Sequence, residues 1–209
     1  MTTAAWVLLA LAGVFAIGNW IAVIRGSKPL EYVCKPATLA FLIAVALAVD
    51  PVHADVRTWF VIALAFSLLG DVFLMLPSDK FVFGLGAFLL GHVAYTVGLN
   101  LHTEGLWLLA IPIPIIAAAL AVRLVRGIQR SGEDPLIPPV IAYVVVIAAM
   151  VSSAVASGNA VAAAGAGLFM VSDAVIGETR FVKAQVWGGL VIMVTYHLGQ
   201  ALLTVSLVT

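Results

Sequence analysis

Long apolar runs follow one another along the whole chain, and short stretches rich in proline, glycine and charge separate them. Each run approaches the roughly 20 residues that a helix needs to cross the hydrocarbon core of a bilayer. The pattern predicts eight membrane-spanning helices, at residues 3–24, 32–49, 56–76, 81–100, 105–125, 137–157, 160–177 and 184–207. We therefore expect an all-α bundle of eight transmembrane helices that forms a single domain over residues 1–209.

Composition supports a membrane protein. Of the 209 residues, 64% are hydrophobic and 10% are charged, whereas a soluble domain carries about 45–50% apolar and about 25% charged residues. The single cysteine, Cys34, excludes an intrachain disulfide, and the formal net charge of zero argues against nucleic acid as a partner. No basic residue precedes the first apolar run, which favours a first span over a cleaved signal peptide.

Basic residues are unevenly distributed between the two sides of the predicted bundle. The odd-numbered connections and their span edges carry Arg25, Lys28, Lys35, Lys80, Arg123, Arg126, Arg130, Arg180 and Lys183. The even-numbered connections carry only Arg57. The positive-inside rule therefore predicts that the odd connections are cytoplasmic and that both termini lie outside. We expect a multi-pass protein of a bacterial inner membrane.

The two halves of the chain show a weak internal repeat. "VIRG", which ends at Gly26, is matched by "LVRG", which ends at Gly127, 101 residues later. "LLGD", which ends at Asp71, is matched by "MVSD", which ends at Asp173, 102 residues later. Four spans in each half would give both halves the same orientation, so the repeat is predicted to be a parallel 4+4 repeat about an axis along the membrane normal.

Asp71 and Asp173 are the two charged residues that lie well within predicted spans. Each costs roughly 2.5–3.5 kcal/mol at mid-membrane on insertion scales, so such residues usually face the bundle interior and mark function. Both are expected roughly 6–9 Å below the cytoplasmic interface, from their distance to the predicted span ends and the rise of a helix. A shared depth would let both reach water from that side.

Other polar residues are predicted near the same level. Supporting roles are predicted for Asn19, Ser67, His92, Tyr95, Tyr196 and Gln200. Ser67 and Asp71, four residues apart, share a helix face, as do Tyr196 and Gln200. Lys35 and Arg25 are candidates for contact with a lipid phosphate. His53 and His102 fall in outer connections, where solvated side chains are expected.

Several short motifs together resemble the YhhN-type membrane proteins, a family that includes the lysoplasmalogenases. The matching pieces are Lys35-Pro36, Gly70-Asp71, "FVFGLGAFLLGHVAY" with His92 and Tyr95, Ser172-Asp173, and Tyr196 with Gln200. The resemblance covers nearly the whole chain. It implies an eight-span bundle that hydrolyses the vinyl ether bond of lysoplasmalogens to a fatty aldehyde and a glycerophospho-alcohol. His197 stands where the family pattern has another aromatic residue, so no catalytic role is carried onto it.

Vinyl ether hydrolysis requires acid, because protonation of the β-carbon creates the oxocarbenium ion to which water adds. Two carboxyl groups serve an oxocarbenium-like state in glycoside hydrolysis. Burial and a nearby like charge both disfavour the ionised form of a carboxyl. We therefore expect an acid/base dyad of Asp71 and Asp173, one protonated and the other ionised, that acts on a lysophospholipid without a cofactor. Which aspartate carries the proton, the headgroup and the oligomeric state are left open.

Other functions fit some of the same residues. A proton-coupled transporter would use two intramembrane acids in a parallel repeat. A zinc-dependent lipid hydrolase could use Asp71, His92, Asp173 and His197 as ligands, although no His-x-x-x-His spacing supports it. A haem site between His92 and His197, or a purely structural scaffold, is less favoured.

Overall fold

The computed structural model describes residues 1–78 and 80–209; Asp79, in the predicted connection between the third and fourth spans, lies outside the described residues. The long helices are α1 (Thr3–Arg25), α2 (Lys28–Ala48), α3 (Ala54–Met75), α4 (Phe81–Asn100), α6 (Pro112–Ser131), α7 (Ile137–Ala156), α8 (Ala160–Phe181) and α9 (Gly188–Val205). Short elements are α5 (Trp107–Ala110), η1 (Asp134–Leu136) and η2 (Ser206–Val208). Within the described residues, eight helical segments are long and apolar enough to cross a membrane, which confirms the predicted all-α fold.

Two spans begin or bend differently from the prediction. Helix α2 begins at Lys28, because Pro29 suits the first turn of a helix and Lys28 pairs with Glu31 one turn later at 2.8 Å. Lys35 therefore lies two turns inside the helix. The fifth span consists of α5 and α6, which meet at Pro112, and it continues to Ser131.

The seventh span also differs, because α8 continues to Phe181 where the prediction ended at residue 177. Its last turns stay helical because the carboxylate of Glu178 receives two hydrogen bonds from Arg123 of α6, at 2.7 and 2.5 Å. Asp173 is thus eight residues from its helix end, about 12 Å of rise, whereas Asp71 is four residues from the end of α3, about 6 Å. The equal distances expected from the sequence are wrong.

Small residues set the closest helix contacts. The backbones of α8 and α9 touch at Gly165 and Gly199: a methyl group on Gly199 would lie 2.8 Å from the carbonyl oxygen of Gly165. Gly84, Gly91 and Gly98, spaced seven residues apart on α4, face α3, where added methyl groups would approach Leu74, Ala63 and Phe60. These glycines let the helices approach closely, as small residues do in membrane bundles.

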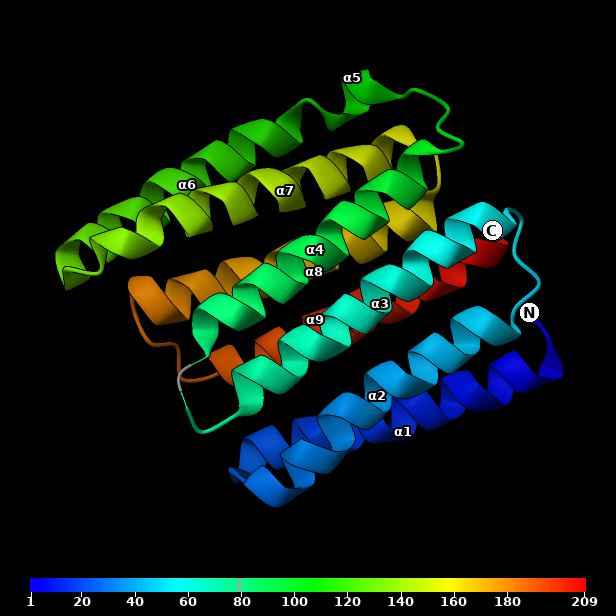
Figure 1. The fold of residues 1–209 in the computed structure, drawn as a ribbon, viewed down its shortest axis with the longest axis horizontal. Coiled ribbons are helices and arrows are strands. Elements are labelled where there is room, and N and C mark those ends of the chain that lie inside the picture. Colours follow the sequence, from blue (N-terminus) through cyan, green and yellow to red (C-terminus); the bar gives the residue numbers. More distant parts are fainter. Residues whose placement is uncertain (79) are drawn as a thin grey trace.

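The bundle is arranged in neighbouring helix pairs (Figure 1). Helices α1 and α2 form one edge and α6 with α7 the opposite edge, while α3, α4, α8 and α9 lie between them. Helix α4 packs against α7 of the second half, and α9 packs against α2 of the first half. A parallel repeat would relate these two contacts, although the repeat itself stays a prediction.

Both termini lie at the same end of the bundle, together with the second, fourth and sixth connections (Figure 1). The connections with the basic residues lie at the opposite end. Large apolar side chains such as Val14, Leu108 and Ile115 are exposed on the outer surface, as expected for helices that face lipid. Which end faces the cytoplasm remains the prediction made from charge.

Candidate active site

The interior of the bundle contains two hydrogen-bonded polar groups, each built around one aspartate. Three helices contribute to each group, and one of the three always comes from the other half of the chain. Asp71 on α3 meets side chains of α2 and α9, whereas Asp173 on α8 meets side chains of α7 and α4. In each group, the aspartate thus meets one helix of its own half of the chain and one helix of the other half.

The first group joins Asp173, His92 and Tyr143. The Tyr143 hydroxyl donates to Oδ2 of Asp173 at 2.7 Å. His92 Nε2 lies 2.9 Å from that hydroxyl oxygen and 3.1 Å from the same carboxylate oxygen. A proton on Nε2 satisfies both contacts, which leaves His92 Nδ1 buried without a hydrogen-bond partner among the described residues. Tyr143 and His92 together hold one face of the carboxyl in place.

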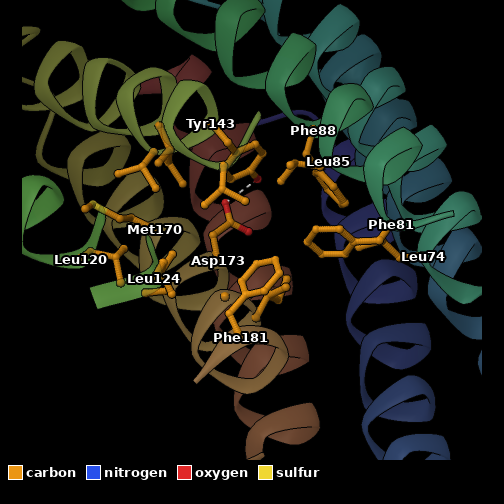
Figure 2. Close-up of a pocket in the computed structure, with 16 residues that line it drawn as sticks. Leu74, Phe81, Leu85, Phe88, Leu120, Leu124, Tyr143, Met170, Asp173 and Phe181 are labelled. Carbon is orange, nitrogen blue, oxygen red and sulfur yellow. Dashed lines mark hydrogen bonds between the residues drawn. The ribbon is translucent and has the colours of Figure 1, made fainter. Parts of the chain in front are cut away.

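Asp173 also lines an apolar pocket between α4, α6, α7 and α8 (Figure 2). Its walls include Leu85, Leu120, Leu124, Met170 and Phe181, and Asp173 and Tyr143 bring the polar groups. The close-up shows the carboxyl pointing into the pocket. Oδ1 of Asp173 makes no hydrogen bond to the described residues, so it is the carboxyl oxygen best placed to meet a bound molecule.

The second group joins Asp71, Lys35 and Tyr196. Lys35 Nζ lies 3.2 Å from Oδ1 of Asp71, and the Tyr196 hydroxyl donates to Oδ2 at 2.8 Å. Lys35 and Asp71 retain only 4% and 1% of their exposure, so this ion pair is shielded from water. In such a position each charge depends on the other, because an isolated buried charge is very costly.

Further predicted residues extend the second group. Tyr95 donates to Oε1 of Gln200 at 2.6 Å, and Trp20 donates to Nδ1 of His197 at 3.1 Å. Asn19 and Ser67 are buried, and their polar side-chain atoms have no hydrogen-bond partner among the described residues. The structure thus places every predicted supporting residue in the interior, but His92 belongs to the first group and Tyr95 bonds to α9.

Aromatic rings separate the two groups. Phe88 packs edge-on against Tyr196 and Phe169 at centroid distances of 5.7 and 6.1 Å, and Phe169 contacts His92 at 4.7 Å. Phe88 also lines the pocket, so one ring borders the pocket on one side and the Asp71 group on the other. We call Phe88, Phe169 and Tyr196 the aromatic wall.

The two aspartates of the expected dyad do not bond to each other among the described residues. Asp71 is bonded to Lys35 and Tyr196, and Asp173 to Tyr143 and His92. The physical reason is the helix order, because α4 and α9 lie between α3 and α8. A like charge therefore does not act on either carboxyl at close range.

The four candidate zinc ligands do not converge either. His92 contacts Asp173, but His197 is bonded to Trp20 and Asp71 is bonded to Lys35. Only half of the proposed ligand set could therefore meet one ion. The geometry does not fit the zinc hypothesis in the interior.

The predicted headgroup residues do not line the pocket. Lys35 is buried in its ion pair with Asp71, and Arg25 is exposed at the end of α1 on the far edge of the bundle. Arg180 is closer: its guanidinium lies 5.6 Å from the ring centres of both Phe81 and Phe181, which line the pocket. It also bonds to Glu133 at 3.2 Å.

Tyr143, Phe88 and Arg180 are thus the site residues that sequence reasoning missed. Tyr143 is the single tyrosine of its span, and this isolated hydroxyl in an apolar segment was the available signal. In the sequence, Phe88 resembles any aromatic residue of a helix core, and Arg180 resembles any basic residue at the cytoplasmic end of a span. Only their neighbours distinguish them.

The YhhN family model matches residues 30–207 of the chain. A lysoplasmalogenase of Mycobacterium bovis is 33% identical, over 85% of this chain and 73% of the relative. The human lysoplasmalogenase TMEM86B is 34% identical, over 69% of this chain and 61% of the relative. An uncharacterized membrane protein YhhN of Escherichia coli O6:H1 is 30% identical, over 56% of this chain and 57% of the relative. No solved structure matches the chain significantly.

Proposed function

The chain belongs to the YhhN family, and we propose that it is a membrane lysoplasmalogenase, which hydrolyses the vinyl ether bond of a lysoplasmalogen. The names of the mycobacterial and human relatives support this activity. The observation that carries the proposal is the carboxyl of Asp173, which Tyr143 and His92 hold at the side of an apolar pocket. A bacterial inner membrane is the proposed location, and the name of the YhhN relative supports a membrane protein.

The pocket suits the part of an alkenyl chain next to the vinyl ether, because its cavity of about 40 Å³ is too small for a whole chain. Its lining is apolar except at Asp173 and Tyr143, and each methylene removed from water contributes about 0.8 kcal/mol. Arg180, over two phenylalanine rings that line the pocket, is the candidate contact for the headgroup phosphate. This proposal replaces Lys35 and Arg25 in that role, because the first is buried and the second is remote.

The reaction needs one proton donor and one water. Asp173, protonated on Oδ1, donates its proton to the β-carbon of the vinyl ether, and the neighbouring carbon becomes part of an oxocarbenium ion. The resulting carboxylate faces that cation and stabilises it. Water adds to the cationic carbon and returns a proton to Asp173. The hemiacetal then breaks its C–O bond, the glycerol oxygen takes up a proton, and the aldehyde is released.

Tyr143 and His92 act on Asp173. Both contact Oδ2, so they orient the carboxyl and keep its other oxygen directed to the pocket. His92 Nε2–H, 3.1 Å from Oδ2, can donate to the carboxylate that forms after proton transfer and stabilise it.

Asp71 has a different proposed role, as a positioning residue. Its carboxylate holds Tyr196 and balances Lys35, and Tyr196 is part of the aromatic wall that borders the pocket. The dyad expected from the sequence thus becomes one reacting carboxyl, Asp173, and one carboxyl that supports the wall.

The direct experiment is incubation of the purified protein with a lysoplasmalogen, with mass-spectrometric detection of the fatty aldehyde. An acyl lysophospholipid of the same headgroup is the control substrate, because it has an ester in place of the vinyl ether. Release of aldehyde by the wild type and its loss in Asp173→Asn support the proposal. Turnover close to wild type in a folded Asp173→Asn preparation would contradict it.

A proton-coupled transporter is the second candidate. It is favoured by the two buried aspartates, one in each half of the chain, which meet helices of both halves in the same way. Substrate-dependent flux in proteoliposomes under a proton gradient would favour it. Aldehyde release in detergent, where no gradient exists, favours the hydrolase.

A further inference from the structure

Two histidines and an aspartate converge at the end of the bundle opposite to the basic connections. His53 precedes α3, Asp55 lies in its first turn, and His102 follows α4. Their nearest ligand atoms all lie within 4.8 Å of one another. Residues before α3 and after α4 therefore meet at one point, and both histidines are exposed, as the sequence predicted.

The side chains are in direct contact with one another. The imidazole rings of His53 and His102 are stacked with centroids 3.8 Å apart and planes 10° from parallel. Asp55 Oδ2 lies 2.9 Å from Nε2 of His102, and its Oδ1 accepts from the backbone of Val56 at 2.9 Å. The backbone contact fixes the orientation of the carboxylate. Imidazole binds metals through an unprotonated ring nitrogen, and each of the two rings offers one here.

We propose that His53, Asp55 and His102 bind a divalent transition-metal ion of the Zn²⁺, Co²⁺ or Ni²⁺ type. Two imidazole nitrogens and one carboxylate oxygen match the ligand preference of these ions, whereas Mg²⁺ and Ca²⁺ prefer oxygen ligands alone. Zinc takes ligands at about 2.0–2.2 Å, so atoms within 4.8 Å need only small side-chain rotations. Exposed side chains at this position can make such rotations.

Two further acidic residues outnumber Arg57, the one basic residue in these segments. Asp50 and Glu104 lie in the same two connections as the three ligands, and Glu104 lines the same cavity as His53 and His102. This cavity also has polar walls from Asn159 and Thr209. Water molecules or Glu104 can complete the coordination from that side. A bound ion would link the α2–α3 connection to the α4–α5 connection.

The test uses the full-length protein in detergent without an affinity tag, because a polyhistidine tag would bind the same ions. Metal-free protein is titrated with Co²⁺ alone, and its visible absorption is recorded before and after competition with Zn²⁺. We expect one Co²⁺ ion per chain and its displacement by Zn²⁺. Zn²⁺ should also raise the unfolding temperature of the protein, because an ion that binds the folded state stabilises it.

The variants are His53→Asn, Asp55→Asn and His102→Gln, which remove one ligand each; asparagine is a good residue for a helix N-cap, the place of His53. Each should weaken Co²⁺ binding by about tenfold or more. Asp50→Asn is the matched control, because it removes a negative charge at the same end but no ligand. Circular dichroism and gel filtration confirm that each variant folds.

Binding that persists unchanged in all three ligand variants, or no saturable binding by the wild type, would overturn the proposal. If Asp50→Asn weakens binding as much as Asp55→Asn does, general charge attraction explains the result and the site is rejected. The site is independent of the proposed hydrolase reaction, since it lies at the opposite end of the bundle from the pocket.

Discussion

Tyr143 is the hydroxyl that we propose to position the carboxyl of Asp173 for reaction. It donates to Asp173 at 2.7 Å and is buried against the pocket. Tyr143→Phe removes this hydrogen bond but keeps the ring. If the bond contributes about 1–2 kcal/mol to the placement of the proton donor, kcat falls about 5–30-fold.

The measurement is steady-state kinetics of aldehyde release, with kcat and KM determined separately over a range of pH. A positioning role predicts a lower kcat, a shifted pH profile and a KM close to wild type. Tyr32→Phe, at an exposed position of α2, is the matched control and should leave both constants unchanged. An unaltered kcat in Tyr143→Phe would remove this residue from the site.

The ion pair of Asp71 and Lys35 allows a test of the role proposed for Asp71. Asp71→Asn leaves a buried ammonium without its counter-ion, which lowers the free energy of unfolding by about 3–5 kcal/mol. Turnover should fall with it, because Tyr196 and the aromatic wall lose their support. Lys35→Met in the same chain removes the unpaired charge and should restore most of the stability.

Thermal unfolding and turnover are compared in the single and double variants. A positioning role predicts that the double variant Asp71→Asn, Lys35→Met regains turnover together with stability. A double variant that folds like the wild type but releases no aldehyde would show that the Asp71 carboxylate takes part in the chemistry.

The role of Arg180 as the headgroup contact can be tested by measuring KM and kcat separately. Arg180→Gln removes a charge that lies 5.6 Å from the ring centres of Phe81 and Phe181, two residues that line the pocket. We expect a higher KM for a phosphate-bearing lysolipid with little change in kcat, because uniform binding is lost. Arg126→Gln, at an exposed position of the neighbouring α6, should leave KM unaltered. Equal effects of both substitutions would indicate general attraction to anionic lipid.

At the level of helices, α8 must approach α9 closely to place Asp173. A methyl group on Gly165 would lie 2.8 Å from the amide nitrogen of Leu203 and 2.9 Å from the carbonyl oxygen of Gly199. Since both atoms belong to the backbone, Gly165→Ala forces the helices apart and should destabilise the protein by about 1–3 kcal/mol.

Gly167, two residues along the same helix, is the matched control. A methyl group there would meet no atom within 4 Å, so Gly167→Ala should stabilise the helix by up to about 1 kcal/mol. Unfolding temperatures in detergent give the sign of each effect. Similar shifts for the two variants would mean that the α8–α9 contact does not depend on Gly165.

For the molecule as a whole, the distribution of charge predicts the orientation in the membrane. Cysteines introduced by Asp50→Cys and Gln185→Cys occupy exposed positions at opposite ends of the bundle. The positive-inside rule predicts that a membrane-impermeant maleimide labels the first in intact spheroplasts and the second only after permeabilisation. Cys34 is buried and provides the background. The reverse labelling pattern would invert the topology.

Much of this protein could be predicted from its sequence, because each span must satisfy its backbone and meet lipid by itself. The eight spans, the membrane class and the identity of the two costly aspartates follow from local composition. Helix ends were less predictable: Glu178 stays in α8 because it bonds to Arg123 of another helix, and no local pattern contains that partner.

Tertiary structure alone decided which polar residues meet. Periodicity shows that Ser67 and Asp71 share a face, but it does not say which helix lies opposite that face. Helices α4 and α9 lie between the two aspartates of the expected dyad. Asp71 therefore pairs with Lys35, and Asp173 bonds to Tyr143. Of these two carboxyls, only that of Asp173 lines the pocket. The sequence thus determined that two acids are buried in a membrane bundle, whereas helix packing determined their partners, because those contacts join residues far apart in the chain.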